Sequence, residues 1–588
     1  MKRLLLLLLI LFPLIISSQS FQNNAPWMQD NALKKKGIIT LNEIAIAAEK
    51  YFNTIDRFKK GSGLKPFERW KYQWSFYLNE NGTIASSKKL WSAWEQKNTM
   101  SAAKTSTDNS NWLSVGPNSS SNTYSSSTLK SSGQGRINVV AVDPSNSNTY
   151  YVGAPAGGIW KSTDAGINWS PLTDYLPQIG VSGIAIHPTD SDIIYIATGD
   201  DDANDSYSVG VMKSIDGGAT WNATGSMNVI PNSMNEIYID PNNHETVMVA
   251  TSSGVFKSTN GGGIWVLKLP EDIIDLKMKP GDATTWYAVS KDTFYKSTDS
   301  GETFSVINIP TLTNSLRLTM DVTVANPNYI YIVSASGTSY PTTFNGVYKS
   351  TNSGASFTKT TQSSDIFGST QAWYDLALTV SADNENIVYV GVLDIWKSTN
   401  GGNNFSKINQ WFNPNIASYT HADIHFMRFI DGKFFAGTDG GIYVSENEGA
   451  NFTDLTNTLG ISQFYKISVS PQNSNNIVGG IQDNGGMAFN ENKWRNYHGG
   501  DGMEGNVHPT EPNTHYGFIQ YGGALYKTTD GGKTNQGSIG APDAEVNGSD
   551  GGGEWVTPMA INSKGDVYSA YKKLYKLEGD AWSVISTN

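Results

Sequence analysis

The chain has no cysteine among its 588 residues, and arginine is scarce. The absence of cysteine excludes disulfide bonds, thiolate metal sites and cysteine nucleophiles, so packing must stabilise the fold. Beyond residue 100 the arginines are Arg136, Arg317, Arg428 and Arg495. With 42 basic against 53 acidic residues, the net charge of −11 does not provide the basic surface that nucleic acids and anionic membranes require. We therefore expect neither as a partner.

Long apolar runs are also missing, except at the N-terminus, which reads MKRLLLLLLILFPLIISSQS. A basic pair, an apolar run from Leu4 to Ile16 and small residues at Ser18 and Ser20 are typical of a signal peptide. We assign it to residues 1–20, because the run is too short for a membrane-spanning helix. The sequence therefore predicts a monomer without a transmembrane segment, secreted by a Gram-negative bacterium or held on its surface.

Glycine and aromatic residues are abundant, with 58 Gly, 17 Trp and 28 Tyr, and they recur in a repeated phrase. The phrase GGIWKSTDAGINW at residues 157–169 returns as VGVMKSIDGGATW, SGVFKSTNGGGIW and further near copies. Ten β-rich first strands, from VVAVDP at 139 to PMAIN at 558, mark units that each contain four short strands. A period of roughly 45 residues per four-stranded unit is what a β-propeller blade requires. We predict an all-β fold, a β-propeller of about ten four-stranded blades over residues 136–588.

The residues before the propeller have a different pattern. Apolar residues at helical spacing and several tryptophans predict a small helical segment over residues 21–104. Residues 105–135 are rich in Ser and Asn and indicate a linker, in which NWLSV at 111–115 could form an isolated strand.

The repeated phrase marks the turn between the third and fourth strands of a blade. In its first copy Asp164 can accept hydrogen bonds from turn N–H groups, Gly166 can adopt a backbone conformation that side chains resist, and Trp169 can pack against a neighbouring blade. The pattern S/T-x-D/N-x-G-x-x-W/F resembles the Asp box of BNR-repeat proteins. We expect these turns to be structural locks rather than sites, because a reaction needs one site and not eight. The turn residues are Asp164, Asp216, Asn260, Asp299, Asn352, Asn400, Asn447 and Asp530.

From residue 135 onward, the repeats resemble the Asp-box propellers of sortilin-type receptors, which have ten blades, and of secreted bacterial BNR-repeat proteins. This resemblance implies a protein that binds a protein or glycan ligand on its axial face, which is our first functional hypothesis. Two enzyme families share the boxes. Sialidases need three arginines around the substrate, which this chain does not supply in one place. Xyloglucan-cleaving glucanases carry an aspartate in a phrase like R-T-D-I-G-G, where this chain reads GAPAGGIW with Ala156. A glycoside hydrolase is the second hypothesis, and the sequence leaves open whether the protein is an enzyme.

In a propeller, the loops from second to third strands and from one blade's fourth strand to the next blade's first strand open on one face. In this chain these loops carry the unusual polar phrases, so we expect a binding or catalytic surface there. The alternative is that these polar residues only close the ring. The expected ligand-binding residues are Tyr374, His421, Asp423, His425, Gln482, Asp483, Asn484, His498 and Asp501.

Three kinds of chemistry are compatible with this face. Glycoside hydrolysis needs two carboxylates, for which the candidates are Asp375, Asp423, Asp439, Asp483 and Asp501. Calcium could bind the acidic run, because Ca²⁺ prefers several carboxylate oxygens; this run contains Asp200, Asp201, Asp202 and Asp205. His421, Asp423 and His425 alternate along the chain and could hold a transition metal. Because no fourth ligand is evident, they also fit a hydrogen-bonded ring around the axis. No other cofactor is indicated.

Overall fold

The structure, a computed structural model, describes residues 25–59, 61–103, 113–119, 121–122, 133–337, 341–546 and 551–586. The expected signal peptide and most of the expected linker lie outside these residues. Of the strand expected at 111–115, residues 111 and 112 also lie outside them, and residues 113–115 form no strand. Within the described part of the chain, no helix is long and apolar enough to cross a membrane.

The ten four-stranded sheets predicted from the repeat are all present, and they follow one another along the chain as sheets 1 to 10. Each is an antiparallel meander of consecutive strands. Sheets 1 to 4 consist of β2 (Val139–Asp143), β3 (Asn146–Ala154), β4 (Gly158–Ser162) and β5 (Ser170–Pro171); β6 (Val181–Ile186), β7 (Ile194–Thr198), β8 (Val211–Ser214) and β9 (Asn222–Ala223); β10 (Met234–Asp240), β11 (Asn243–Thr251), β12 (Gly254–Ser258) and β13 (Val266–Leu269); and β14 (Asp275–Lys279), β15 (Asp282–Val289), β16 (Phe294–Ser297) and β17 (Ser305–Ile307).

Sheets 5 to 7 repeat the same plan. They consist of β18 (Ser315–Val322), β19 (Ile330–Gly337), β20 (Thr342–Ser350) and β21 (Thr358–Lys359); β22 (Ala377–Val380), β23 (Val388–Gly391), β24 (Ile395–Ser398) and β25 (Ser406–Lys407); and β26 (Ile424–Ile430), β27 (Lys433–Thr438), β28 (Gly441–Ser445) and β29 (Thr453–Asp454).

Sheets 8 to 10 complete the set. They consist of β30 (Phe464–Val469), β31 (Ile477–Ile481), β32 (Gly485–Asn490) and β33 (Lys493–His498); β34 (Gly502–Val507), β35 (His515–Ile519), β36 (Ala524–Thr528) and β37 (Ser538–Gly540); and β38 (Met559–Ile561), β39 (Val567–Ala570), β40 (Leu574–Glu578) and β41 (Ala581–Val584). The short strand β1 (Ser121–Asn122) pairs in parallel with β33 and adds a fifth strand to sheet 8.

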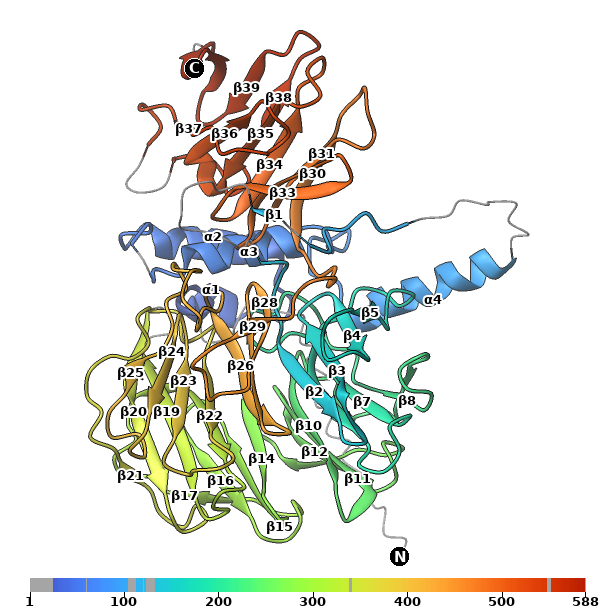
Figure 1. Ribbon diagram of the computed structural model, residues 1–588, viewed down its shortest axis with the longest axis vertical. Coiled ribbons are helices and arrows are strands. Elements are labelled where there is room, and N and C mark those ends of the chain that lie inside the picture. Colours follow the sequence, from blue (N-terminus) through green and yellow to red (C-terminus); the bar gives the residue numbers. More distant parts are fainter. Residues whose placement is uncertain are drawn as a thin grey trace, which may run out of the picture.

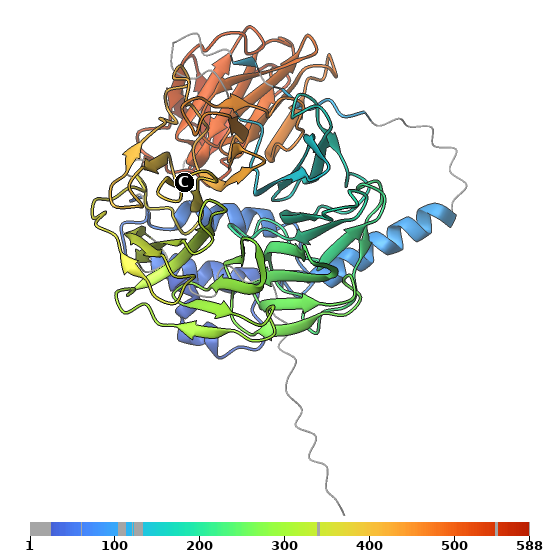
Figure 2. The same cartoon turned by 60° about the horizontal axis from the view of Figure 1, so that its bottom comes forward.

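Sheets 1 to 7 form a closed ring, because sheet 1 packs on sheet 7 (Figures 1 and 2). The Ile137 N–H donates to the Thr438 carbonyl at the junction. The Trp169 indole lies against sheet 7, and its Nε1–H donates to the Leu455 carbonyl at 2.8 Å. Side chains of sheets 1, 2 and 7 share one apolar cluster. The tryptophan of the first repeated turn therefore closes the ring.

Sheets 8 to 10 stack on one another as a separate group at the opposite end of the molecule (Figure 1). Helices α2 (Leu41–Phe52) and α3 (Leu64–Trp74) lie between this group and the ring. The remaining helical elements are η1 (Pro26–Gln29), α1 (Asn31–Lys34), α4 (Ser87–Ala103), which extends away from the body, and η2 (Gln520–Gly522).

The sequence of the helical segment explains its position. A capping box of Thr40 and Glu43 starts α2. Helix α3 follows Gly63, whose φ of 86° favours glycine, and it buries Phe67 and Trp70 at helical spacing. These side chains join Trp555, Phe518 and their neighbours from sheets 9 and 10 in a single core. Burial of large aromatic surfaces makes the helices an integral layer of the fold.

The eight repeated turns share one hydrogen-bond pattern. In the first turn Ser162 Oγ donates to Asp164 Oδ1 at 2.8 Å, and the same Oδ1 accepts from the Asn168 N–H at 2.9 Å. The Gly166 N–H donates to Ser162 Oγ at 2.8 Å, with φ of 86° at that glycine. The other seven turns repeat the three bonds with their own residues. Each Asp or Asn is thus used within its own turn.

Candidate active site

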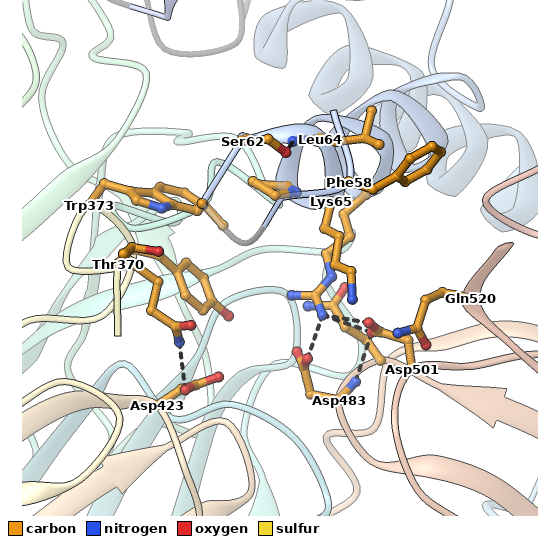
Figure 3. A pocket seen from close by; sticks show the side chains of 18 of the residues that line it. Phe58, Ser62, Leu64, Lys65, Thr370, Trp373, Asp423, Asp483, Asp501 and Gln520 are labelled. Carbon is orange, nitrogen blue, oxygen red and sulfur yellow. Dashed lines mark hydrogen bonds and ion pairs between the residues drawn. The ribbon is translucent and has the colours of Figure 1, made fainter. Parts of the chain in front are cut away.

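A cavity of about 540 Å³ lies where the ring, the helical layer and sheets 8 to 10 meet (Figure 3). The strands contribute to it through six loops: β7–β8, β21–β22, β25–β26, β31–β32, β33–β34 and β35–β36. All six connect second to third strands or one sheet to the next, as expected for the polar face. A further wall comes from residues 57–59 and 61–69, which precede and begin α3.

Three of the expected aspartates line this cavity. Asp423 lies on the side of the ring, and Asp483 and Asp501 lie opposite it on the side of sheets 8 and 9 (Figure 3). Two of the three have unusual backbones, with φ of 63° at Asp423 and 55° at Asp483. Such conformations cost energy for residues other than glycine, and they concentrate at functional sites.

The Asp483 and Asp501 carboxylates are held by a residue that the sequence did not single out, Arg69 of α3. Its Nη2 donates to both Asp501 oxygens at 2.8 Å and also contacts Asp483 Oδ1. The Asp483 N–H donates to Asp501 Oδ1 at 3.1 Å. Arg69 is more than 400 residues from both aspartates in the sequence. No local pattern could therefore predict this contact, because only the tertiary structure brings the partners together.

The three carboxyls differ in their surroundings. Burial raises the pKa of Asp423 well above its usual range, and the nearby Asp439 and Asp483 carboxylates raise it further. Burial also raises the pKa of Asp483, to about 8, although Arg69 opposes the shift. Desolvation disfavours the charged form of an acid, so the surroundings of Asp423 favour its protonated form. Asp501, in contrast, has a direct ion pair with Arg69 on both oxygens.

Asp375 and Asp439 lie behind the cavity wall and connect to it through hydrogen bonds. Gln371 Nε2 donates to Asp375 Oδ2 at 2.9 Å and to Asp423 Oδ1 at 2.6 Å. Tyr374, which lines the cavity, donates its hydroxyl to both Asp439 oxygens at 2.9 Å. These two aspartates therefore support the wall and do not face the cavity.

His425 lies between two carboxylates, those of Asp439 and Asp202. Its Nε2 is 3.0 Å from Asp439 Oδ1 and its Nδ1 is 2.6 Å from Asp202 Oδ2. Burial alone would lower the pKa of His425, but the Asp439 and Asp202 charges outweigh it and raise the pKa to about 10. Burial likewise opposes ionisation of Asp439, yet the His425 charge lowers its pKa to about 2.

Of the other expected face residues, Gln482 lines the cavity, while Asn484 is buried and donates to the Asp439 carbonyl at 3.1 Å. Nδ1 of His421 lies 3.2 Å from the carbonyl oxygen of the next residue, Ala422. His498 is fully buried and stacks on Tyr526 with ring centroids 4.6 Å apart. The expected face thus divides into a cavity and a supporting layer.

The described residues do not show the clusters that the expected metal sites would require. Among the described residues, no three His, Asp or Glu side chains gather so that they could hold a metal ion. Asp200 pairs with Arg136 at 2.6 Å, and Asp202 pairs with Arg317 at 2.6 Å, so these carboxylates already have cationic partners. No cluster among the described residues therefore supports the calcium prediction for Asp200, Asp201, Asp202 and Asp205, which stays a prediction. His421, Asp423 and His425 have the separate partners described above and do not converge on one point.

We expect the two buried histidines, His425 and His498, to titrate at widely different pH values. The His425 ring should stay protonated up to about pH 10, because two carboxylates flank it. Burial lowers the pKa of His498 to about 4, so that ring should stay neutral above this pH. NMR of histidine-labelled protein, with His425→Gln and His498→Gln variants for assignment, measures both. Titration of either ring near pH 6.5 would contradict these two environments.

Similar proteins are known. No protein-family model matches the sequence. A xyloglucanase from a Paenibacillus species is 27% identical over 217 residues, which cover 30% of this chain and 21% of the relative. A xyloglucanase from Hypocrea jecorina is 26% identical over 222 residues, which cover 30% of this chain and 26% of the relative. The matched segments thus span about a fifth to a quarter of the length of these relatives.

Solved structures agree on the fold. The GH74 enzyme of Niastella koreensis superposes with a TM-score of 0.55 at 17% identity, covering 78% of this chain and 73% of that one. The GH74 xyloglucanase of Xanthomonas campestris superposes with a TM-score of 0.59 at 14% identity, covering 78% and 75%. At these identities the likeness establishes a β-propeller architecture.

Proposed function

We propose that the protein is a secreted glycoside hydrolase that cleaves a polysaccharide, with xyloglucan as the first candidate substrate. The observation that carries the proposal is the position of Asp423, whose burial favours the protonated form, across a cavity from the Asp483–Asp501 pair. The xyloglucanase relatives support it. These xyloglucanases support hydrolysis better than the sortilin-type ligand binding that we placed first, so hydrolysis becomes the leading hypothesis.

The roles follow from the burial of Asp423 and from the ion pair between Asp501 and Arg69. Asp423 is the proton donor: its proton passes to the leaving glycosidic oxygen as the bond from that oxygen to the anomeric carbon breaks. Asp501 is the opposing carboxylate, which either removes a proton from the attacking water or attacks the anomeric carbon first. In both courses water supplies the hydroxyl on the anomeric carbon. If Asp501 attacks first, the remaining water proton passes to Asp423 and restores the acid. If Asp501 removes the proton from water, exchange with solvent returns a proton to Asp423 and removes one from Asp501.

Ala156 offers no carboxylate, and it does not line the cavity. Under this proposal Asp423, from the β25–β26 loop of the ring, supplies the ring's reacting carboxyl group instead.

Two polar atoms of the wall, Arg69 Nε and Gln520 Oε1, are buried and have no hydrogen-bond partner within the described chain. A ligand rich in hydroxyl groups suits such a wall, since unpaired buried polar groups are costly.

The test incubates residues 21–588 with xyloglucan, other β-glucans and pectic polymers, and measures new reducing ends. We expect release from at least one polymer, and its loss in an Asp423→Asn/Asp501→Asn protein that keeps its unfolding transition. Equal release by the double variant would refute the assigned roles. No release from any polymer by the intact protein would refute the hydrolase proposal.

A further inference from the structure

Nearly half of the residues that line the cavity belong to residues 57–59 and 61–69, which we call the capping segment. The segment is not part of any sheet. Figure 3 shows it lying across the cavity from the carboxyl groups, with Lys65 and Leu64 at the start of α3. A site between two groups of sheets would otherwise be a groove, so this segment determines its shape.

The capping segment and the end of α3 are attached to both groups of sheets. On the ring side, the Trp74 Nε1–H donates to the Asn204 carbonyl at 3.0 Å. On the side of sheets 8 to 10, the Tyr72 hydroxyl donates to the Tyr465 carbonyl at 2.8 Å, and Phe58 meets the Tyr521 ring edge-to-face at 6.1 Å. Together with the Arg69 ion pairs, these contacts make the segment a fixed wall.

The backbone of the segment also lies directly on the ring. Gly61 has a φ of 83°, and a Cβ at this position would be 2.6 Å from Thr370 Oγ1 and 2.9 Å from Pro341 Cβ. Both neighbours belong to the β19–β20 and β21–β22 loops of sheet 5 and its link to sheet 6. Only glycine permits this close approach.

We infer that the capping segment closes the cleft at one end, so that the site takes the terminus of a saccharide chain and not its interior. A cavity of about 540 Å³ falls within the range of about 300–1,000 Å³ typical of small-molecule pockets. A chain cut in its interior must enter and leave the site, whereas a wall joined to both groups of sheets leaves no second exit on that side. The inference rests on the proposed function for the nature of the ligand.

The intact protein is tested on xyloglucan by following reducing ends and viscosity together. We expect reducing ends to accumulate while viscosity stays nearly constant, with one short product present from the earliest time. A steep fall in viscosity with the first bonds broken, and a broad range of products, would overturn the inference while leaving hydrolysis intact.

Gly61→Ala tests the role of the segment. The added Cβ must push the segment away from Thr370, and we expect the viscosity lost per bond broken to rise. Gly432→Ala is the matched control, because Gly432 has a φ of 73° but open space around its Cβ position. It carries the same backbone strain without the clash, so its product pattern should be that of the intact protein. Unchanged products with Gly61→Ala, in a protein that unfolds normally, would contradict the role of the segment.

A binding measurement separates this inference from the proposed function. Asp423→Asn protein is titrated with xyloglucan and with an equal mass of xyloglucan cut into shorter chains. A site for chain ends should bind more protein per mass of the shorter chains, in proportion to their ends. Equal binding per mass, or no binding to either, would overturn the inference; end-dependent binding without hydrolysis by the intact protein would refute the proposed activity alone.

Discussion

An Arg69→Met variant is expected to lose about 3–5 kcal/mol of unfolding free energy at pH 7, the usual cost of removing one partner from a buried ion pair. The Arg69 side chain is 19% exposed and its partner Asp501 is 5% exposed, so water cannot replace the lost contacts. Urea unfolding followed by tryptophan fluorescence measures the loss. Arg57→Met is the control: it also removes two hydrogen bonds, but to Glu49, which is 54% exposed, and should cost less than about 1 kcal/mol.

The loss should grow with pH. The pKa of Asp483 is about 8 in the folded protein, above its value of 3.8 as a free side chain, so the folded state holds this proton more tightly. The resulting stability is complete below about pH 4 and declines as the pH rises toward 8. Removing Arg69 raises the pKa of Asp483 further, so the variant continues to lose stability above pH 8, where the intact protein no longer does. The stability difference between the two proteins should therefore grow above about pH 8, and a difference that is the same at pH 7 and pH 10 would contradict the assigned ion pairs.

Asp423→Asn is expected to lower kcat on the cleaved polymer by about 10²- to 10⁴-fold, the usual contribution of a general acid. Asparagine has the same shape, and its Oδ1 can keep the hydrogen bond from Gln371, so KM should change little. The alkaline fall in activity, which reflects loss of the Asp423 proton, should disappear in the variant. Aryl glycosides with good leaving groups should be affected less, because their departure needs no proton.

Asp394→Asn is the matched control for this variant. Asp394 is also buried and hydrogen-bonded, to Lys407 at 3.1 Å and to the Trp411 N–H at 2.8 Å, but it is not among the residues that line the cavity. Its variant should retain activity. If the two variants lose activity equally, or if aryl glycosides suffer as much as the polymer, Asp423 is not the proton donor.

The repeat made the blades predictable because each blade is specified locally. Four strands and a turn of the Ser162–Asp164–Gly166 type lie within about 45 residues, and their periodicity is written in the sequence. The number of blades in the closed ring was not predictable in this way. Ring size depends on contacts such as Trp169 with Leu455, and the same repeated phrase occurs on both sides of the division between sheets 7 and 8. No local pattern distinguishes a ring of seven with three further sheets from other closures.

The candidate site was also predictable only in part: its face was predicted, but the long-range partners of its residues were not. Loop positions indicated that Asp423, Asp483 and Asp501 share a face, and the structure brings them to one cavity. The acidic run at Asp200 and Asp202 indicated calcium instead, because the sequence does not show that Arg136 and Arg317 reach these side chains from other sheets. The residues missed were those of the helical segment, whose contacts with the propeller are all long-range.

The closed ring and the capping segment also impose an order on the folding of the protein. The junction between sheets 1 and 7 joins Ile137 and Thr438, which are about 300 residues apart, and Arg69 meets Asp501 across a separation of 432 positions. Contacts this distant in sequence form slowly, and they leave apolar sheet faces uncovered in the meantime. The buried side chains of the N-terminal helices therefore lack their packing partners until the last sheets have folded. A chain that ends before about residue 500 should have no site at all, because Asp501 and Gln520 line the cavity. The protein therefore acquires its chemistry only when its last sheets have folded.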